Sequence, residues 1–211
     1  MPDSWSRYFT GEIFWALAML DRVFPDAGYG EPAMRIARYI ATERRGVEGY
    51  RPDLPDHWTA YGFATLAASP GWELPDEYLP YVRRQMGIFS TEIRYESQRT
   101  NSALSHLTRG RQTVGSGLGT IGEALTNWAT VAATTPELTG LHDSIVERVR
   151  CVGGAAIARQ VQPDEVTGDD DPSAVVGAWF QFDVTRMDDQ QHLLSALLGA
   201  ASLSGTDGET A

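Results

Sequence analysis

Apolar residues recur every three or four positions along most of the chain. The first stripe passes through Phe9, Ile13, Leu17 and Leu20 and reaches Phe24. This spacing places the side chains on one face of an α-helix. The predicted helix carries few polar residues on any face, which is typical of a helix packed between other elements. We therefore expect an inner helix near the start of the chain.

A second, amphipathic kind of helix follows the first. Its apolar stripe includes Ile36 and Ile40, and charged side chains fill the other face: Arg35, Arg38, Glu43, Arg44 and Arg45. This pattern predicts an outer helix with one solvated face. The alternation repeats, with inner helices expected to begin at residues 56, 120 and 187 and outer helices near 75 and 136. Arg83, Arg84 and Gln85 lie opposite the apolar stripe of the second outer helix. The sequence thus predicts an all-α protein built of helical hairpins.

The segments between these helices are less regular. Residues 97–110 predict a short helix, and the four glycines between 110 and 119 predict a flexible approach to the third inner helix. The acidic stretch 162–171 predicts a loop. Residues 174–184 are the only segment with strand character, and they fit equally well an extended lead into Met187. We expect one α-helical domain over residues 1–203 and a disordered tail over 204–211.

Polar side chains gather where each predicted inner helix begins. These four polar heads contain Glu12, the run Asp56-His57-Trp58, Glu123, and the run Asp188-Asp189-Gln190-Gln191-His192. Polar groups on a buried helix lower stability unless they have partners or a use. If the inner helices are parallel, their first turns lie at the same end of the helical layer. The sequence therefore predicts that the heads meet at one mouth.

Inner and outer helices with polar heads resemble the α/α-toroid superfamily of six-hairpin glycosidases and terpenoid-cyclase-like barrels. The resemblance covers residues 8–202 by pattern, and four hairpins in place of six imply a partial barrel, an open one, or one completed by a second subunit. It implies acid and base carboxylates at the ends of inner helices. The matching candidates for catalysis are Glu12, Asp56, Glu123 and Asp189. The candidates for ligand binding are Trp15, His57, Trp58, Tyr61, Trp128, Asp188 and His192.

Two functions of different classes fit these residues. Glycoside chemistry needs one protonated and one ionised carboxyl held about 5 to 9.5 Å apart, and the aromatic side chains would stack on sugar rings. The alternative is a non-catalytic helical module that binds a ligand or assembles with a partner, in which the carboxylates only cap helices and the aromatics fill the core. An enzyme requires a carboxyl with a raised pKa facing a cleft. A scaffold instead predicts carboxylates that are capped and paired with arginine.

The last polar head permits two further interpretations. The run from Asp188 to His192 is similar to the D-D-x-x-D motif of isoprenoid synthases, which hold a diphosphate through magnesium, but His192 replaces the last aspartate and no second metal motif follows. Asp188 and His192 are also spaced to share a transition metal, with Asp56 and His57 as further ligands. No H-E-x-x-H pair is present, and we expect neither a metal nor a cofactor.

Composition excludes several other classes. All 17 basic residues are arginine, so a phosphate-binding loop with its lysine and a Schiff-base lysine are both excluded. The run from Gly117 to Gly122 matches G-x-G-x-x-G, but no strand precedes it as dinucleotide binding requires. A net charge of −11 argues against binding to nucleic acid or anionic lipid. Cys151 is alone, so no disulfide or thiolate metal cage forms.

The expected partner is a small molecule or a glycan, and a homo-oligomer is compatible with the pattern. No apolar run in the sequence is long enough to cross a membrane, and no signal sequence is evident. We therefore expect a cytoplasmic protein by default.

Overall fold

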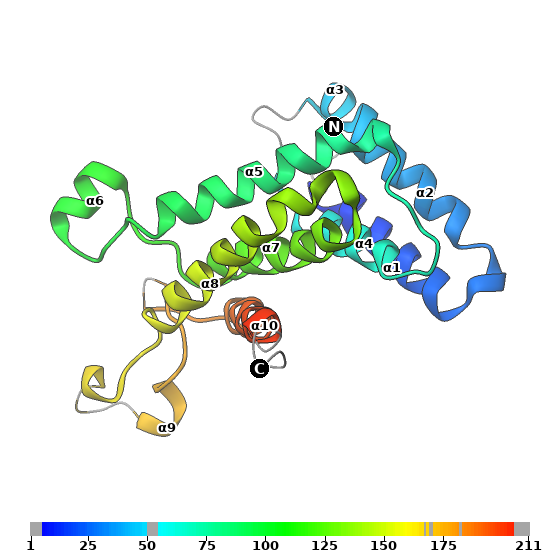
Figure 1. Ribbon diagram of the computed structural model, residues 1–211. Coiled ribbons are helices and arrows are strands. Elements are labelled where there is room, and N and C mark those ends of the chain that lie inside the picture. Colours follow the sequence, from blue (N-terminus) through cyan, green and yellow to red (C-terminus); the bar gives the residue numbers. More distant parts are fainter. Residues whose placement is uncertain (1–5, 50–54, 167, 169–170, 182, 205–211) are drawn as a thin grey trace, which may run out of the picture. The chain divides into compact units, whose positions relative to one another are not determined.

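The computed structural model describes residues 6–49, 55–166, 168, 171–181 and 183–204, and these residues form helices joined by turns (Figure 1). The α-helices are α1 (Phe9–Val23), α2 (Gly30–Arg38), α3 (Arg44–Glu48), α4 (His57–Ala67), α5 (Leu79–Glu96), α6 (Ala103–Arg109), α7 (Ser116–Thr134), α8 (His142–Ile157), α9 (Pro172–Val175) and α10 (Met187–Ser204). A π-helical turn, Tyr39–Glu43, joins α2 to α3. Short 3-10 turns occupy Pro25–Ala27, Asp76–Tyr78, Pro136–Leu141 and Pro163–Glu165. The all-α prediction is confirmed for this part of the chain.

The chain divides into two compact units, neither of which is continuous in sequence. Unit 1 comprises residues 1–89 and 127–145, and unit 2 comprises residues 90–126 and 146–211. The predicted single domain over 1–203 stays a prediction. Most of the predicted tail, residues 205–211, lies outside the described residues.

In unit 1, α1 and α4 run parallel. Asp56, which precedes the first turn of α4, lies so close to Gly11 that a methyl group there would be 2.5 Å from its Oδ2. Further along both helices, Gly62 packs against the ring of Phe14. When successive contacts lie nearer the C-terminus of both helices, the two helices run in the same direction. The two helices therefore begin side by side, as the sequence predicts for inner helices.

The π-helical turn between α2 and α3 changes which residues face the interior. A π turn contains one residue more than an α turn, so the residues beyond it rotate around the helix axis. Arg44, the first residue after the turn, is only 4% exposed, although the charge pattern placed it on the solvated face. That prediction is wrong, because the 3.6-residue period on which it depends does not continue through the turn.

The core of unit 1 is aromatic. The ring of Phe63 on α4 lies 5.1 Å from Phe14, 5.8 Å from Trp128 and 6.2 Å from Tyr78, measured between centroids. The apolar stripe of α5 contains Val82, Met86 and Phe89, and all three side chains are buried. Gln85 is also buried, which contradicts its predicted place on the outer face of that helix. Tertiary packing has overridden the polar character of this side chain.

In unit 2, α7 and α10 are also parallel, and glycines allow them to approach closely. A methyl group at Gly119 would overlap the backbone of His192, and one at Gly122 would lie 2.5 Å from Cβ of Ala196. Helix α7 begins at Ser116, four residues earlier than predicted. The glycines expected to form a flexible approach therefore lie partly within the helix, where they allow close contact.

A buried ion pair joins α5 to the loop before α7 and to Arg159, two residues beyond the end of α8. The Glu96 carboxylate accepts hydrogen bonds from Arg159 Nη1 at 3.0 Å, from Arg99 Nη1 at 2.7 Å and from the backbone N–H of Thr113. Arg159 also donates to the backbone carbonyls of Thr113 and Glu96. The side chains of Glu96 and Arg159 are 4% and 6% exposed. Each buried charge is therefore stabilised by the opposite charge of its partner, and loss of either partner would leave the other charge uncompensated.

The described residues of the segment 174–184 form no extended strand. They contain the end of α9 and a single antiparallel bridge between Gln181 and Val184. Trp179 is instead buried, and its indole N–H donates to the carbonyl of Ala156 at 2.8 Å. No helix among the described residues is both long and apolar enough to cross a membrane.

Candidate functional site

Asp56 stabilises the beginning of α4. Its Oδ1 accepts hydrogen bonds from the backbone N–H groups of Trp58 and Thr59, at 3.1 and 3.3 Å, and its Oδ2 accepts one from Arg44. Arg44 also donates to Glu48 at 2.9 Å. Burial raises the pKa of the Asp56 carboxyl, and Arg44 and the hydrogen bonds from Thr59 oppose that rise. Because Asp56 is fully buried and its oxygens already have these partners, it acts as an N-cap and ion-pair partner.

Aromatic rings of α1 and α4 form a half-buried cluster beside Glu12. The ring of Trp15 stacks on Tyr61 at 4.7 Å and on Trp58 at 5.2 Å, with interplanar angles of 28° and 27°. Glu12 lies one turn before Trp15 on α1 and is exposed. Trp128, another predicted ligand-binding residue, is instead fully buried in the core. The three half-buried rings thus provide an aromatic surface near an exposed carboxylate.

His57, the first residue of α4, is 5% exposed. Its ring contacts Trp58 at 4.5 Å and Tyr8 at 6.0 Å, with the Tyr8 ring edge-on. It therefore lies at the same end of α4 as Asp56 and the aromatic cluster.

Asp189 joins the beginnings of α7 and α10. Its Oδ1 accepts the N–H of Ser116, the first residue of α7, at 3.0 Å, and its Oδ2 accepts the N–H of Arg186 at 3.2 Å. Burial acts to raise the pKa of Asp189, but the hydrogen bonds from Ser116 and Arg186 outweigh this effect, and the pKa lies below its ordinary value. The residue predicted as catalytic therefore caps a neighbouring helix.

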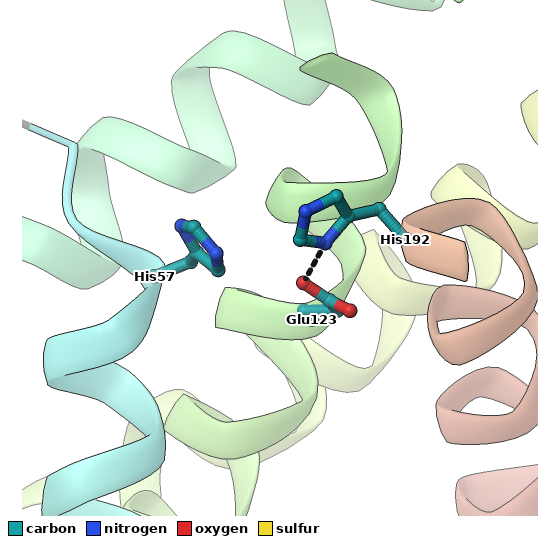
Figure 2. A group of neighbouring side chains, drawn as sticks. All are labelled: His57, Glu123 and His192. Atoms are coloured by element: carbon teal, nitrogen blue, oxygen red, sulfur yellow. Dashed lines mark hydrogen bonds and ion pairs between the residues drawn. The ribbon is translucent and has the colours of Figure 1, made fainter. Parts of the chain in front are cut away.

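A hydrogen-bonded chain connects a buried carboxylate to the surface. Figure 2 shows Glu123 of α7 and His192 of α10 pointing toward each other, and His192 Nδ1 lies 2.8 Å from Glu123 Oε2. On the other side of the ring, Nε2 lies 3.2 Å from Oδ1 of Asp188. Glu123 and His192 are 3% and 6% exposed, whereas the Asp188 side chain is 57% exposed. The hydrogen bond to Glu123, with support from Asp188, raises the pKa of His192 against the opposing effect of burial.

The chain from Asp188 to Glu123 has the elements of a proton path. A protonated imidazole can donate to both carboxylates at once, and a neutral one donates to one of them. Protons can therefore move between solvent and the buried Glu123 through His192. Glu123 lies in the third turn of α7, because that helix begins earlier than the sequence predicts.

The structure thus divides the predicted site residues into several roles. Within each unit, two of the inner helices begin side by side, and the meeting of all four polar heads stays a prediction. The paired aspartates of the D-D-x-x-H run act separately, since Asp189 caps α7 and Asp188 contacts His192. Gln190 of the same run hydrogen-bonds both backbone groups of Trp179.

Glu92, a further titratable group, was not predicted. It lies on α5 beside the buried Phe89 and Ile93, and within the described part of the chain its carboxylate has no hydrogen bond or ion pair. Burial raises its pKa to about 7. Glu92 is three, four or seven positions from Phe89, Glu96 and Gln85, so all four side chains share one face of the helix. A stripe that mixes polar with apolar residues is the sequence pattern that could have predicted a buried Glu92.

Replacing Glu92 with glutamine should stabilise the protein at high pH. The carboxyl ionises near pH 4.5 when unfolded and near pH 7 when folded, so the unfolded state loses its proton first. Stability therefore falls as pH rises between these values. The full shift corresponds to about 3 kcal/mol, and partial exposure reduces the expected gain at pH 8 to about 1–2 kcal/mol.

The measurement is urea unfolding of wild type and Glu92→Gln at pH 4.5 and pH 8. A matched control is Glu147→Gln on α8, where the carboxylate is exposed. Equal stability differences at the two pH values would contradict the assignment.

Comparison of the chain with protein-family models, with curated proteins and with solved structures gives no match.

Proposed function

We propose that the protein processes glycosides by acid–base chemistry and that Glu123 is its proton-transferring carboxyl. The observation that carries this proposal is the hydrogen-bonded chain from the exposed Asp188 through His192 to the buried Glu123. General acid–base catalysis needs a carboxyl whose proton can be replaced between cycles. The hydrogen bonds through His192 supply such a route to Glu123, which is itself only 3% exposed.

His192 orients Glu123 in this proposal. The hydrogen bond to Glu123 raises the pKa of His192, which favours the protonated, positively charged ring, and Nδ1 of this ring lies 2.8 Å from Glu123 Oε2. Glu123 then accepts a proton from the water or sugar hydroxyl that attacks the glycosidic carbon. Asp188 returns that proton to solvent by way of His192.

A second carboxyl is needed to protonate the leaving group. Of the four predicted candidates, Asp56 and Asp189 are held by helix N–H groups and by arginine. Glu12, exposed on the first turn of α1, is the remaining candidate. The stacked rings of Trp15, Trp58 and Tyr61 provide the kind of aromatic surface on which sugar faces stack.

The proposed architecture is an α/α toroid, complete or partial. Parallel α1 and α4, and parallel α7 and α10, support it, because the inner helices of such a barrel all run in the same direction. The amphipathic stripes of α5 and α8 support an outer position for those helices.

The proposal is tested with a panel of aryl glycosides and oligosaccharides. If the panel contains a substrate, Glu123→Gln should lower kcat by about 10²- to 10⁴-fold, which is the usual contribution of a general acid or base. The melting temperature should change little, because glutamine keeps the shape of the side chain. Glu147→Gln serves as the control and should retain full activity. Hydrolysis that survives in Glu123→Gln would refute the assignment.

A second candidate function is a non-catalytic helical module that binds a glycan or assembles with a partner. The use of Asp56 and Asp189 as caps paired with arginine favours it, since this is the arrangement that a scaffold predicts. The same panel separates the two candidates. Oligosaccharides that bind wild type and Glu123→Gln equally, with no turnover by either, would favour the binding module.

A further inference from the structure

We propose that Glu123 and His192 bind a divalent transition-metal ion, with zinc the best match, in place of the proton that they share. The ligand atoms would be Oε2 of Glu123 and Nδ1 of His192, which the structure places 2.8 Å apart. This proposal goes beyond glycoside processing, because it depends only on the binding chemistry of the two side chains.

The spacing of the two atoms is close to what a metal requires. Zinc binds imidazole nitrogen at about 2.0–2.1 Å and carboxylate oxygen at about 2.0–2.2 Å, so its tetrahedral ligands lie about 3.3 Å apart. The Glu123–His192 pair would need to open by about 0.5 Å. The remaining positions are available to water or to additional donors.

Asp188 prepares His192 for this role. Its Oδ1 lies 3.2 Å from Nε2 of the imidazole. When a metal ion replaces the proton between Nδ1 and Glu123, a carboxylate at that position holds the remaining ring proton on Nε2, so that the lone pair of Nδ1 can bind the ion. Histidine ligands of metals commonly donate their second N–H to a carboxylate, which fixes the ring and strengthens the ligand.

Burial distinguishes this pair from another acid–histidine contact in the chain. Glu123 and His192 are both more than nine-tenths buried, so the ion would be attracted in a medium of low dielectric constant. His142 and Asp143 are also in contact, at 3.1 Å, but the Asp143 side chain is fully exposed and the two residues are adjacent in sequence. His142 therefore supplies a matched control.

The experiment is titration of the chelator-treated full chain with zinc by calorimetry, followed by cobalt absorption spectroscopy. Wild type should bind one ion, and cobalt should show the intense visible bands of tetrahedral coordination. His192→Gln and Glu123→Gln should abolish this binding, whereas Asp188→Asn should weaken it about 10- to 100-fold. His142→Gln should bind as wild type does.

Circular dichroism of each variant establishes that it is folded, and zinc should raise the melting temperature only where it binds. Zinc affinity that is unchanged in His192→Gln and Glu123→Gln, or absent from wild type at millimolar zinc, would overturn the proposal. The readout requires no glycoside, so its failure is separate from failure of the proposed hydrolysis. If both proposals hold, zinc inhibits hydrolysis, because it occupies the oxygen of Glu123 that exchanges the proton.

Discussion

Replacing Glu96 with glutamine should lower the free energy of unfolding by about 3–5 kcal/mol. Glu96 is the carboxylate partner of Arg159 and of Arg99, and it also accepts the N–H of Thr113. Glutamine keeps one acceptor oxygen, but its NH₂ group replaces the second one. That NH₂ group is itself a donor, so it cannot accept the hydrogen bonds that Arg159, Arg99 and Thr113 donate to Glu96. The guanidinium of Arg159, 6% exposed, would then be buried without a neutralising charge. Since proteins of this size are stable by about 5–15 kcal/mol, the variant approaches the limit of folding.

The test is urea unfolding monitored by circular dichroism, again with Glu147→Gln as the control on an exposed carboxylate. The double variant Glu96→Gln with Arg159→Met removes both buried charges and should recover part of the loss, because an apolar side chain requires no ionic partner. A loss below about 1 kcal/mol in the single variant would show that the ion pair does not stabilise the fold.

Replacing Gly119 with alanine should destabilise the protein by about 3 kcal/mol or more. The added methyl group would overlap the carbonyl carbon of His192 and lie 2.6 Å from the backbone nitrogen of Leu193. Backbone atoms cannot rotate away as a side chain can, so α7 and α10 must separate. The hydrogen bond between His192 and Glu123 would lengthen as a result.

Gly154 on α8 provides the matched control. It also lies within a helix, but an added methyl group would meet no atom within 4 Å. Gly154→Ala should therefore stabilise the protein by about 0.5–1 kcal/mol, because alanine loses less backbone entropy on folding. Thermal unfolding of the two variants should show shifts of opposite sign. A stabilised Gly119→Ala variant would contradict the close approach of the helices.

The helices themselves were predictable because their apolar stripes are long and regular. The pattern from Phe9 to Phe24 predicted α1 within one residue at its C-terminal end, and Asp56 identified the N-terminus of α4. Helix α7 was predicted four residues too short, because Gly117 and Gly119 normally indicate a loop. Gly119 lies against the backbone of α10 and Gly117 lies against Thr113. No local sequence pattern contains these contacts.

The roles of the polar residues were predicted less well than their positions. The sequence marked the run from Asp188 to His192 as unusual, with Asp189 predicted as a catalytic carboxylate and Asp188 as a ligand-binding one. Their chemistry differs because one is exposed beside an imidazole and the other is buried against Ser116 and Arg186. Arg44 was misplaced for another reason, since a π turn leaves no mark in apolar periodicity.

Parallel pairing of helices also affects how the chain folds. Gly11 contacts Asp56 and Gly119 contacts His192, so the paired residues are 45 and 73 positions apart. An antiparallel hairpin of the same helices would form its first contacts across a short turn. Here the two helices pack only after the long segment between them has formed a closed loop. The loss of chain entropy on closing that loop grows with its length. We infer that this all-helical chain folds more slowly than up-and-down bundles of equal size, because its stabilising contacts are distant in sequence.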